Sequence, residues 1–279
     1  MKVLLVGVGL INGSFSLALR NRRDITFGGS DVTEDHLDRA VELGIISEKF
    51  ELAQGIEWAD FILLGIPVDA IKSLLPQVLD SIRPDQLVVD FGSTKETICE
   101  VVRSHKNRKN FLAAHPIAGT EHSGPEAAFA TLFKDQNLII CEKDLTNKLL
   151  TEDFLNVAKS AGFYFSFMSS EEHDRHLAYI SHLSHISSYV LSNTVLQKEK
   201  DGEVILDLAG SGFESTVRLA KSSPQMWSSI FRENKRMVLD SIKAYQGELD
   251  ELRKMIEAED VKGVSHYLEE GRKIRKILK

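Results

Sequence analysis

Short apolar runs alternate with amphipathic stretches over the first 168 residues of the chain. The apolar runs predict strands over residues 2–6, 25–30, 61–66, 87–91, 111–114, 137–141 and 163–168. Between them, apolar positions at helical spacing predict helices over residues 12–22, 34–43, 68–80, 94–105 and 151–161. Continuous apolar strands that alternate with helices are typical of a parallel sheet covered on both faces. The sequence therefore predicts a doubly wound α/β domain, in which ligands bind beyond the carboxyl ends of the strands.

The pattern changes near residue 168, where the strand-like runs stop. Long amphipathic stretches then predict helices over residues 170–197, 214–221, 224–246 and 260–278. Ser169 and Glu172 have the spacing of a capping box at the start of the first of these helices, and Pro224 suits the first turn of the third. We therefore predict an α/β domain over residues 1–168 and an all-α domain over residues 169–279.

The composition fits this two-domain prediction and narrows the functional classes. The 279 residues are enough for two domains, and the 43% that are hydrophobic are enough for a buried core. A net charge of −7 argues against a general nucleic-acid binder. Two cysteines, Cys99 and Cys141, are too few for a disulfide framework, which favours a reducing cytoplasm. The uncharged run between Lys2 and Arg20 is too short to span a bilayer, so we expect neither a signal peptide nor a membrane segment.

A glycine-rich segment follows the first predicted strand and opens the first predicted helix. It reads Gly7-Val8-Gly9-Leu10-Ile11-Asn12-Gly13. The first glycine of such a segment allows a tight turn, the second lets a pyrophosphate approach the backbone, and the helix N-terminus offers free N–H groups to the phosphates. Asn12 stands where the usual motif has its third glycine. We predict a dinucleotide-binding loop, with a plain strand–helix turn as the alternative. Its cofactor-binding residues are Gly7, Gly9, Leu10, Ile11 and Gly13.

Two further residues at the ends of predicted strands point to the same cofactor. Asp31 ends the second strand region, where a carboxylate would accept hydrogen bonds from the adenosine ribose. A carboxylate there would repel a 2′-phosphate, so the sequence favours NAD over NADP. The alternative for Asp31 is an ordinary turn or helix-start residue. Pro67 follows the strand at 61–66, and we assign it to the cofactor site as well.

His115 and Ser93 are the candidate catalytic residues. His115 follows a predicted strand, and a neutral imidazole near pH 7 can take a hydroxyl proton as hydride leaves the same carbon. A buried structural histidine is the alternative. The hydroxyl of Ser93 is able to bond the reacting hydroxyl or orient the base, but Ser93 and Glu96 also have capping-box spacing. Glu121 is either a polar group on the substrate side or a solvated loop acid.

The predicted helical domain carries a second group of polar residues. His173, His176, His182 and His185 lie within one long predicted helix, and the last two share a face because they are three apart. A metal pair needs further ligands that the sequence does not supply, so we predict no metal and favour a polar pocket wall. Arg218 has the chemistry to hold a substrate carboxylate through two parallel hydrogen bonds, with a plain surface arginine as the alternative.

Six segments in this order resemble the prephenate/arogenate dehydrogenase family of tyrosine biosynthesis, and the resemblance covers nearly the whole chain. They are GVGLINGS, VVDFGSTK, AHPIAGTEHSG, HDRHLAYISHLSH, GSGFESTVRLA and SSPQMWSSIFRENK. The resemblance implies a Rossmann-like NAD domain followed by a helical dimerisation domain. It also implies the NAD-dependent oxidative decarboxylation of prephenate to 4-hydroxyphenylpyruvate, in a cytoplasmic homodimer.

The resemblance also implies roles for individual residues. His115 is the base or hydrogen-bond acceptor, and Ser93 assists it at the substrate hydroxyl. His185 lines the pocket and His182 supports it. Residues that would contact or border the substrate are His185, Arg218, Thr120, Glu121, His182 and Trp227. In this family the tryptophan that matches Trp227 lies near the partner subunit's site.

Two departures from the family pattern keep alternatives open. Asn12 replaces a glycine in the loop, and Ser215 stands where several relatives carry an acid. A missing carboxylate disfavours the ammonium group of arogenate, so we favour prephenate and keep arogenate dehydrogenase as the alternative. A β-hydroxyacid-type dehydrogenase is disfavoured because residues 175–197 contain no lysine. A non-catalytic NAD-binding module is the remaining alternative. With the sequence ending at Lys279, we expect no further regulatory domain.

Overall fold

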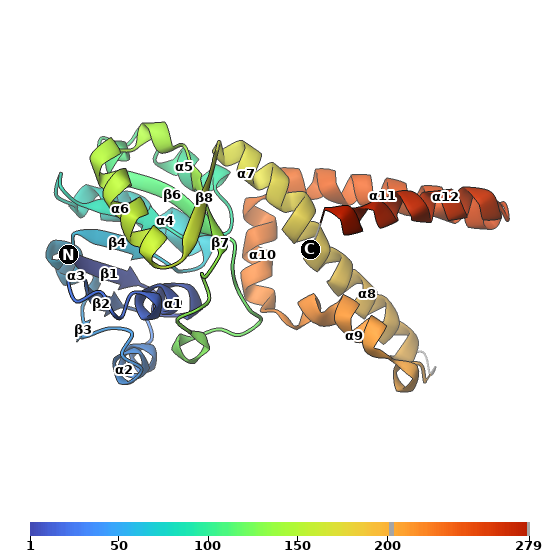
Figure 1. Ribbon diagram of the computed structural model, residues 1–279, viewed down its shortest axis with the longest axis horizontal. Helices are drawn as coiled ribbons and strands as arrows, with labels where there is room; N and C mark the ends of the chain where they lie inside the picture. The colour runs from blue at the N-terminus through green and yellow to red at the C-terminus, as the bar shows by residue number, and fades with distance from the viewer. Residues whose placement is uncertain (201–203, 278–279) are drawn as a thin grey trace. The chain divides into compact units, whose positions relative to one another are not determined.

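The computed structural model describes residues 1–200 and 204–277 (Figure 1). In these residues eight strands form one sheet in the order β3-β2-β1-β4-β5-β6-β7-β8. The strands are β1 (Lys2–Val6), β2 (Thr26–Ser30), β3 (Glu48–Lys49), β4 (Phe61–Leu64), β5 (Leu87–Asp90), β6 (Phe111–Pro116), β7 (Gln136–Cys141) and β8 (Phe163–Met168). The first six strands have the order of a dinucleotide-binding sheet, which confirms the predicted doubly wound domain.

Both faces of this sheet are buried, as the continuous apolar strands predict. On β1, Val3 and Leu5 belong to one apolar cluster, while Leu4 and Val6 belong to another. Successive side chains of a strand point to opposite faces, so each cluster marks one face. The first face is covered by α1 (Leu10–Ala18), α2 (Glu34–Glu42) and α6 (Lys148–Ser160). The second face is covered by α3 (Leu52–Trp58), α4 (Val68–Ser81) and α5 (Glu96–Val101).

The structure departs from the predicted sheet at both edges. β6 and β7 pair antiparallel, because the connection between them contains the 3-10 turn η2 (Pro125–Ala127) and no crossover helix. The sequence analysis missed β3 and α3. β3 is a short polar edge strand, and α3 contains Gly55, where a Cβ would lie 2.6 Å from Leu4 Cδ1. Close packing against β1 therefore sets this helix, and a local apolar pattern does not reveal it.

Helices follow the sheet, as predicted. They are α7 (Ser170–Leu177), α8 (Leu183–Lys200), α9 (Ser211–Val217), α10 (Pro224–Glu233), α11 (Lys235–Glu257) and α12 (Val261–Arg272). The capping box at Ser169 and the position of Pro224 at the start of α10 are confirmed. The single helix predicted over 170–197 is interrupted by a π-helical turn, η4 (Ala178–His182).

The predicted helix over 224–246 is two helices, because the chain leaves helical geometry at Asn234. Contacts between residues divide the chain at the same place, into Met1–Asn234 and Lys235–Lys279. The first unit contains the sheet and α7 to α10. In it, α10 packs on α4 through an ion pair between Lys72 and Glu233. The predicted boundary near residue 168 remains a prediction.

Candidate active site

The glycine-rich loop has the geometry that a dinucleotide needs. Gly7 has a φ of +81°, and a Cβ there would lie 2.6 Å from Ile66 Cγ2 and 2.9 Å from the carbonyl oxygen of Gly65. The Cβ of any other residue would therefore overlap these atoms, and the positive φ would be strained. Gly9 is the N-cap of α1, which begins at Leu10 and has no acidic residue in its first turn. The first-turn N–H groups have no intrahelical acceptor and face no nearby carboxylate on their own helix, which suits a phosphate.

Asn12 fills the place of the missing third glycine and stabilises the loop. The side chain is fully buried, and its Nδ2 lies 3.1, 2.9 and 3.1 Å from the carbonyl oxygens of Val6, Gly7 and Leu63. These atoms belong to the ends of β1 and β4. The amide fits because Gly65 stands opposite it, and a Cβ on Gly65 would lie 2.5 Å from Asn12. The departure from the motif is therefore accommodated by a second glycine.

Asp31 connects the loop to the end of β2. Its Oδ2 accepts a hydrogen bond from the N–H of Val8 at 3.0 Å, and its Oδ1 accepts one from the N–H of Thr33 at 2.9 Å. The side chain thus stabilises a turn, as one alternative predicted, and also holds the glycine loop. Pro67 is exposed at the N-cap of α4, three residues after the end of β4, which is the strand next to β1. All the predicted cofactor-binding residues therefore lie near the carboxyl ends of the parallel strands.

His115 lies near the carboxyl end of β6, on the same side of the sheet as these residues, and its side chain is half-buried. Its Nδ1 is 2.8 Å from Nε2 of His173, which is on α7 and fully buried. Nδ1 of His173 is in turn 2.7 Å from Oδ1 of Asp174. Burial holds the pKa of His115 and of His173 well below its usual value, so both rings are neutral near pH 7.

Ser93 lies between β5 and α5, near the carboxyl end of the strand next to β6. The alternative that Ser93 and Glu96 form a capping box is wrong, because α5 begins at Glu96 with Lys95 as its N-cap. The N–H groups of Lys95 and Glu96 donate instead to the carboxylate of Asp174, at 2.7 and 2.9 Å. The Lys95 ammonium forms an ion pair with Asp90, and both side chains are fully buried.

The helical residues gather around a tryptophan. Trp227 on α10 stacks on His185, with ring centroids 3.6 Å apart, and meets the edge of His182 at 5.9 Å. His182 is buried, which lowers its pKa to about 4, and its Nδ1 lies 3.2 Å from Nδ2 of Asn234. His185 is half-buried, and its Nδ1 is 3.1 Å from the carbonyl oxygen of Ser181. Its Nε2 is therefore left for another partner.

Arg218 is exposed in the 3-10 turn η6 (Arg218–Lys221). Its positive charge contributes to a lowered pKa at Glu121, after a backbone hydrogen bond, and at His185, after burial. Arg218 is therefore close enough to each of the other two side chains to interact with it electrostatically. Thr120 lies in the same loop as Glu121, and its Oγ1 accepts a hydrogen bond from the N–H of His122 at 3.3 Å.

The roles of Lys95, His173 and Asp174 were not predicted from the sequence. His173 appeared there only as one member of a histidine cluster, although its side chain reaches the candidate base. The pairing of Asp174 with backbone N–H groups 79 and 78 residues earlier has no local signal. In the residues that the structure describes, no group of three or more histidine, cysteine, aspartate or glutamate side chains is arranged to hold a metal ion.

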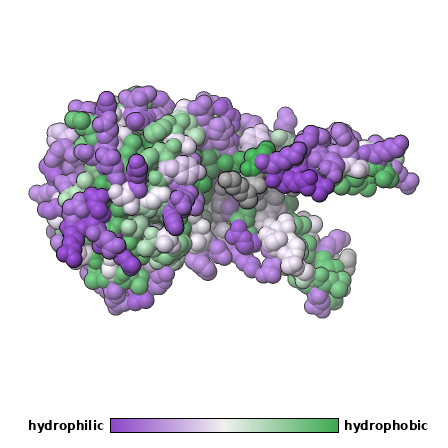
Figure 2. Space-filling model, in the orientation of Figure 1, coloured by the Kyte–Doolittle hydropathy of each residue, from purple (hydrophilic) through white to green (hydrophobic). Residues whose placement is uncertain are grey.

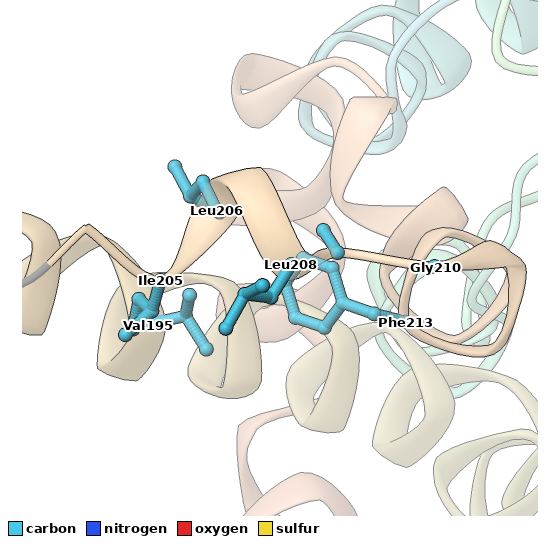
Figure 3. Close-up of a pocket in the computed structure, with 7 residues that line it drawn as sticks. Val195, Ile205, Leu206, Leu208, Gly210 and Phe213 are labelled. Atoms are coloured by element: carbon cyan, nitrogen blue, oxygen red, sulfur yellow. The ribbon is translucent and has the colours of Figure 1, made fainter.

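A pocket of about 260 Å³ lies on the helical side of the first unit (Figure 3). Apolar groups and one glycine line it: Val195, Ile205, Leu206, Leu208, Ala209, Gly210 and Phe213. It contains none of the predicted site residues. Leu208 of this lining and the neighbouring Val204 are exposed, and the surface at this end of α8 and α9 is hydrophobic (Figure 2). No helix in residues 1–200 and 204–277 has both the length and the apolar character to cross a membrane.

Comparisons with known proteins match both parts of the chain to one family. Residues 15–165 match the family model "Prephenate dehydrogenase, nucleotide-binding domain", and residues 169–270 match "Prephenate dehydrogenase, dimerization domain". The chain is 31% identical to prephenate dehydrogenase of Bacillus subtilis over 98% of its own length and 75% of that protein. It is 29% identical to cyclohexadienyl dehydrogenase of Zymomonas mobilis, over 99% of its length and 96% of that protein.

Solved structures give the same result. The crystal structure of prephenate dehydrogenase from Aquifex aeolicus, in complex with hydroxyphenyl propionate and NAD+, superposes with a TM-score of 0.92 at 30% identity and covers 100% of this chain and 98% of that one. Synechocystis arogenate dehydrogenase superposes with a TM-score of 0.80 at 26% identity, over 99% of both chains. The chain described here belongs to the prephenate dehydrogenase family.

Proposed function

We propose that this chain catalyses the NAD-dependent oxidative decarboxylation of prephenate to 4-hydroxyphenylpyruvate. The observation that carries the proposal is the position of His115: a neutral imidazole in β6, at the sheet edge that holds the glycine-rich loop and Asp31. A base beside a nicotinamide site is what removal of hydride and proton from a secondary alcohol requires.

The chain's residues divide the work as follows. NAD⁺ supplies the hydride acceptor when bound, held by the backbone of Gly7 and Gly9 and by Asp31. His115 takes the proton of the ring hydroxyl as the hydrogen on the same carbon departs as hydride. The bond between the ring and its carboxylate then breaks, CO₂ leaves, and the electron pair completes the aromatic ring. The proton returns from His115 to the oxygen as the phenol forms, so no net proton is consumed.

The substrate side is formed by loop residues that follow β5 and β6, together with residues of the helices after the sheet. Ser93 donates to or accepts from the reacting hydroxyl, and Arg218 binds a carboxylate of the substrate. His185, Thr120 and Glu121 border the pocket, and Trp227, which is itself in contact with His182, supports the ring of His185. Trp227 makes this contact within one chain, so the stacking itself does not require a partner subunit.

Arogenate is the second candidate substrate, since one solved relative is an arogenate dehydrogenase. Arogenate carries an ammonium group where prephenate has a ketone. Ser215 offers no carboxylate for that ammonium, and its hydroxyl donates to the carbonyl oxygen of Gly212 at 2.9 Å. This supports prephenate as the preferred substrate.

The domain organisation follows from the same assignment. We propose that residues 1–168 bind NAD and that residues 169–279 complete the substrate site and form a homodimer. The exposed apolar surface at the ends of α8 and α9 supports a role in association. We place the enzyme in the cytoplasm, without nucleic-acid or membrane partners, because its net charge is −7 and both cysteines are buried and unpaired.

The test is an assay of the purified protein with NAD⁺ and each substrate. We expect NADH and 4-hydroxyphenylpyruvate from prephenate, with a higher kcat/KM than for arogenate, and weaker activity with NADP⁺. His115→Asn should lower kcat by about 10²-fold or more and leave the Kd for NAD⁺ unchanged. An enzyme that turns over neither substrate would refute the proposal, and an unchanged kcat in His115→Asn would refute the base assignment.

A further inference from the structure

We propose that His173 and Asp174 are positioning residues that fix the tautomer of His115, so that its Nε2 carries the lone pair facing the substrate. This inference rests on the proposed function, because it assigns His115 as the base. Neither residue is placed in contact with substrate or cofactor. Each acts through the imidazole ring of His115.

Three side chains, from β6 and α7, form a hydrogen-bonded series. Asp174 Oδ1 lies 2.7 Å from Nδ1 of His173, and Nε2 of His173 lies 2.8 Å from Nδ1 of His115. The two rings meet edge to face, with centroids 5.0 Å apart and planes at 64°. His173 and Asp174 are fully buried on α7, so water does not replace either partner.

The direction of each hydrogen bond in this series follows from the carboxylate of Asp174. An ionised carboxylate only accepts, so Nδ1 of His173 must carry the hydrogen. A neutral imidazole has one N–H, so Nε2 of His173 is an acceptor. Nδ1 of His115 must then be the donor, which leaves Nε2 of His115 without a hydrogen. Burial keeps the pKa of His173 well below its usual value, and a doubly protonated ring that would break this sequence is therefore disfavoured.

The surroundings keep Asp174 in the required state and place. Its carboxylate accepts three hydrogen bonds, from His173 and from the backbone N–H groups of Lys95 and Glu96 at the start of α5. Burial raises the pKa of Asp174 to about 6, so the carboxylate is ionised at the neutral or alkaline pH of an assay. The carbonyl oxygen of Asp174 accepts from Nδ2 of Asn234 at 2.8 Å, which fixes the backbone as well.

Asp174 therefore acts on both candidate catalytic residues, His115 and Ser93. It sets the tautomer of His115 through His173, and it holds the N-terminus of α5, two residues after Ser93. A purely structural role as a helix cap would concern only the second contact. The two roles differ in their effect on the protonation of His115, which can be measured.

Three variants separate the roles. In Asp174→Asn the amide oxygen should take the place of Oδ1, which accepts from both His173 and Lys95, so that the NH₂ group faces only the N–H of Glu96. This arrangement keeps the tautomers of His173 and His115 and weakens only the contact with α5. His173→Leu removes the acceptor at similar size, whereas His173→Gln keeps an oxygen that can accept from Nδ1 of His115. His176→Leu, an exposed histidine on the same helix, is the control.

We expect kcat to fall by about 10²-fold in His173→Leu and by less than tenfold in Asp174→Asn, with KM for prephenate and the Kd for NAD⁺ within about threefold of the starting protein. The kcat of His173→Gln should be at least tenfold higher than that of His173→Leu. The kcat of His176→Leu should match that of the starting protein. Equal activity of the leucine and glutamine variants would overturn the inference, and so would a loss of kcat in Asp174→Asn as large as in His173→Leu.

Nitrogen-15 NMR of the unmodified protein provides a readout that does not depend on folding of a variant. The ring nitrogens of His115, assigned by their loss in His115→Asn, should show a hydrogen on Nδ1 and none on Nε2. A hydrogen on Nε2 would refute the inference even if every variant loses activity. If the protein turns over neither prephenate nor arogenate, the proposed function fails, while the NMR result still decides the tautomer.

Discussion

Asn12 and Gly65 form a complementary pair, and exchanging their sizes is a sharp test of how the nucleotide loop is built. Asn12→Gly restores the glycine of the usual motif, and Gly65→Ala adds one methyl group opposite it. The three atoms nearest to a Cβ on Gly65 all belong to the side chain of Asn12, at 2.5 to 2.8 Å. The overlap that Gly65→Ala creates is therefore with Asn12, and removing Asn12 should remove that overlap.

The magnitudes follow from the contacts. The Asn12 amide nitrogen carries two hydrogens for three buried carbonyl oxygens, so its loss costs about two hydrogen bonds at about 1 kcal/mol each. Glycine in α1 adds a few tenths of a kcal/mol, so Asn12→Gly should lower the free energy of unfolding by about 2–3 kcal/mol. Gly65→Ala should cost about 1–2 kcal/mol, because overpacking of about 1–3 kcal/mol is offset by a smaller gain from a stiffer unfolded chain.

The double variant decides whether the two residues are coupled. With Asn12 gone, Gly65→Ala should cost nothing or stabilise slightly, which corresponds to a coupling free energy of about 1–3 kcal/mol. The assay is urea unfolding at one fixed protein concentration, because association would otherwise contribute. Gly247→Ala on α11 is the control, since a Cβ there meets nothing within 4 Å. Equal costs of Gly65→Ala in the two backgrounds would refute the reasoning.

Three further predictions concern buried groups. Lys95→Met leaves the Asp90 carboxylate buried without its partner and should lower the free energy of unfolding, measured in urea, by about 3–5 kcal/mol. Lys254→Met removes an exposed ion pair and should lower it by about 1 kcal/mol or less, so equal losses in the two variants would contradict the prediction. Stability should fall as pH is lowered from 6.5 to about 4, because His182 then binds a proton only when unfolded; each such group contributes about 1.4 kcal/mol per pH unit. His115 and His173 act in the same direction, and Asp174, with its raised pKa, offsets one of them, so a flat urea midpoint over this range would be evidence against neutral buried rings. Both cysteines are buried and their thiol pKa values are raised by burial, so a thiol reagent should label them only after unfolding, and labelling of the native protein at the unfolded rate would show that they are accessible.

The parts of the fold that depend on local pattern could be predicted from the sequence. Seven strands, the capping box at Ser169 and the start of α10 at Pro224 follow from short-range spacing. Parallel strands place their carboxyl ends at one edge, so Gly7, Asp31 and His115 could be assigned to one site before any coordinates were known. Resemblance to a family then supplied the reaction, which spacing alone does not specify.

The parts that the sequence analysis missed depend on contacts between distant residues. Asn12 reads as a defect in the motif until Gly65 is seen opposite it. The Asp174 carboxylate lies in the second turn of α7, and nothing in that position indicates that its partners belong to the start of α5. β7 reads as another parallel strand, and its direction is set by the absence of a helix between it and β6 in the described chain. Periodicity describes one segment at a time and does not report such pairs.

The cluster around His115 shows why a folded chain would retain costly polar groups in its interior. His173, Asp174 and the pair of Lys95 with Asp90 are fully buried, and each loses solvation that apolar residues of the same size would not. Apolar side chains here would pack as well and stabilise the sheet more. They would leave the ring of His115 free to adopt either tautomer and the N–H groups of α5 without acceptors. The extensive apolar burial on both faces of the sheet compensates for these groups, so the protein retains a single protonation state at the one ring where the reaction requires it.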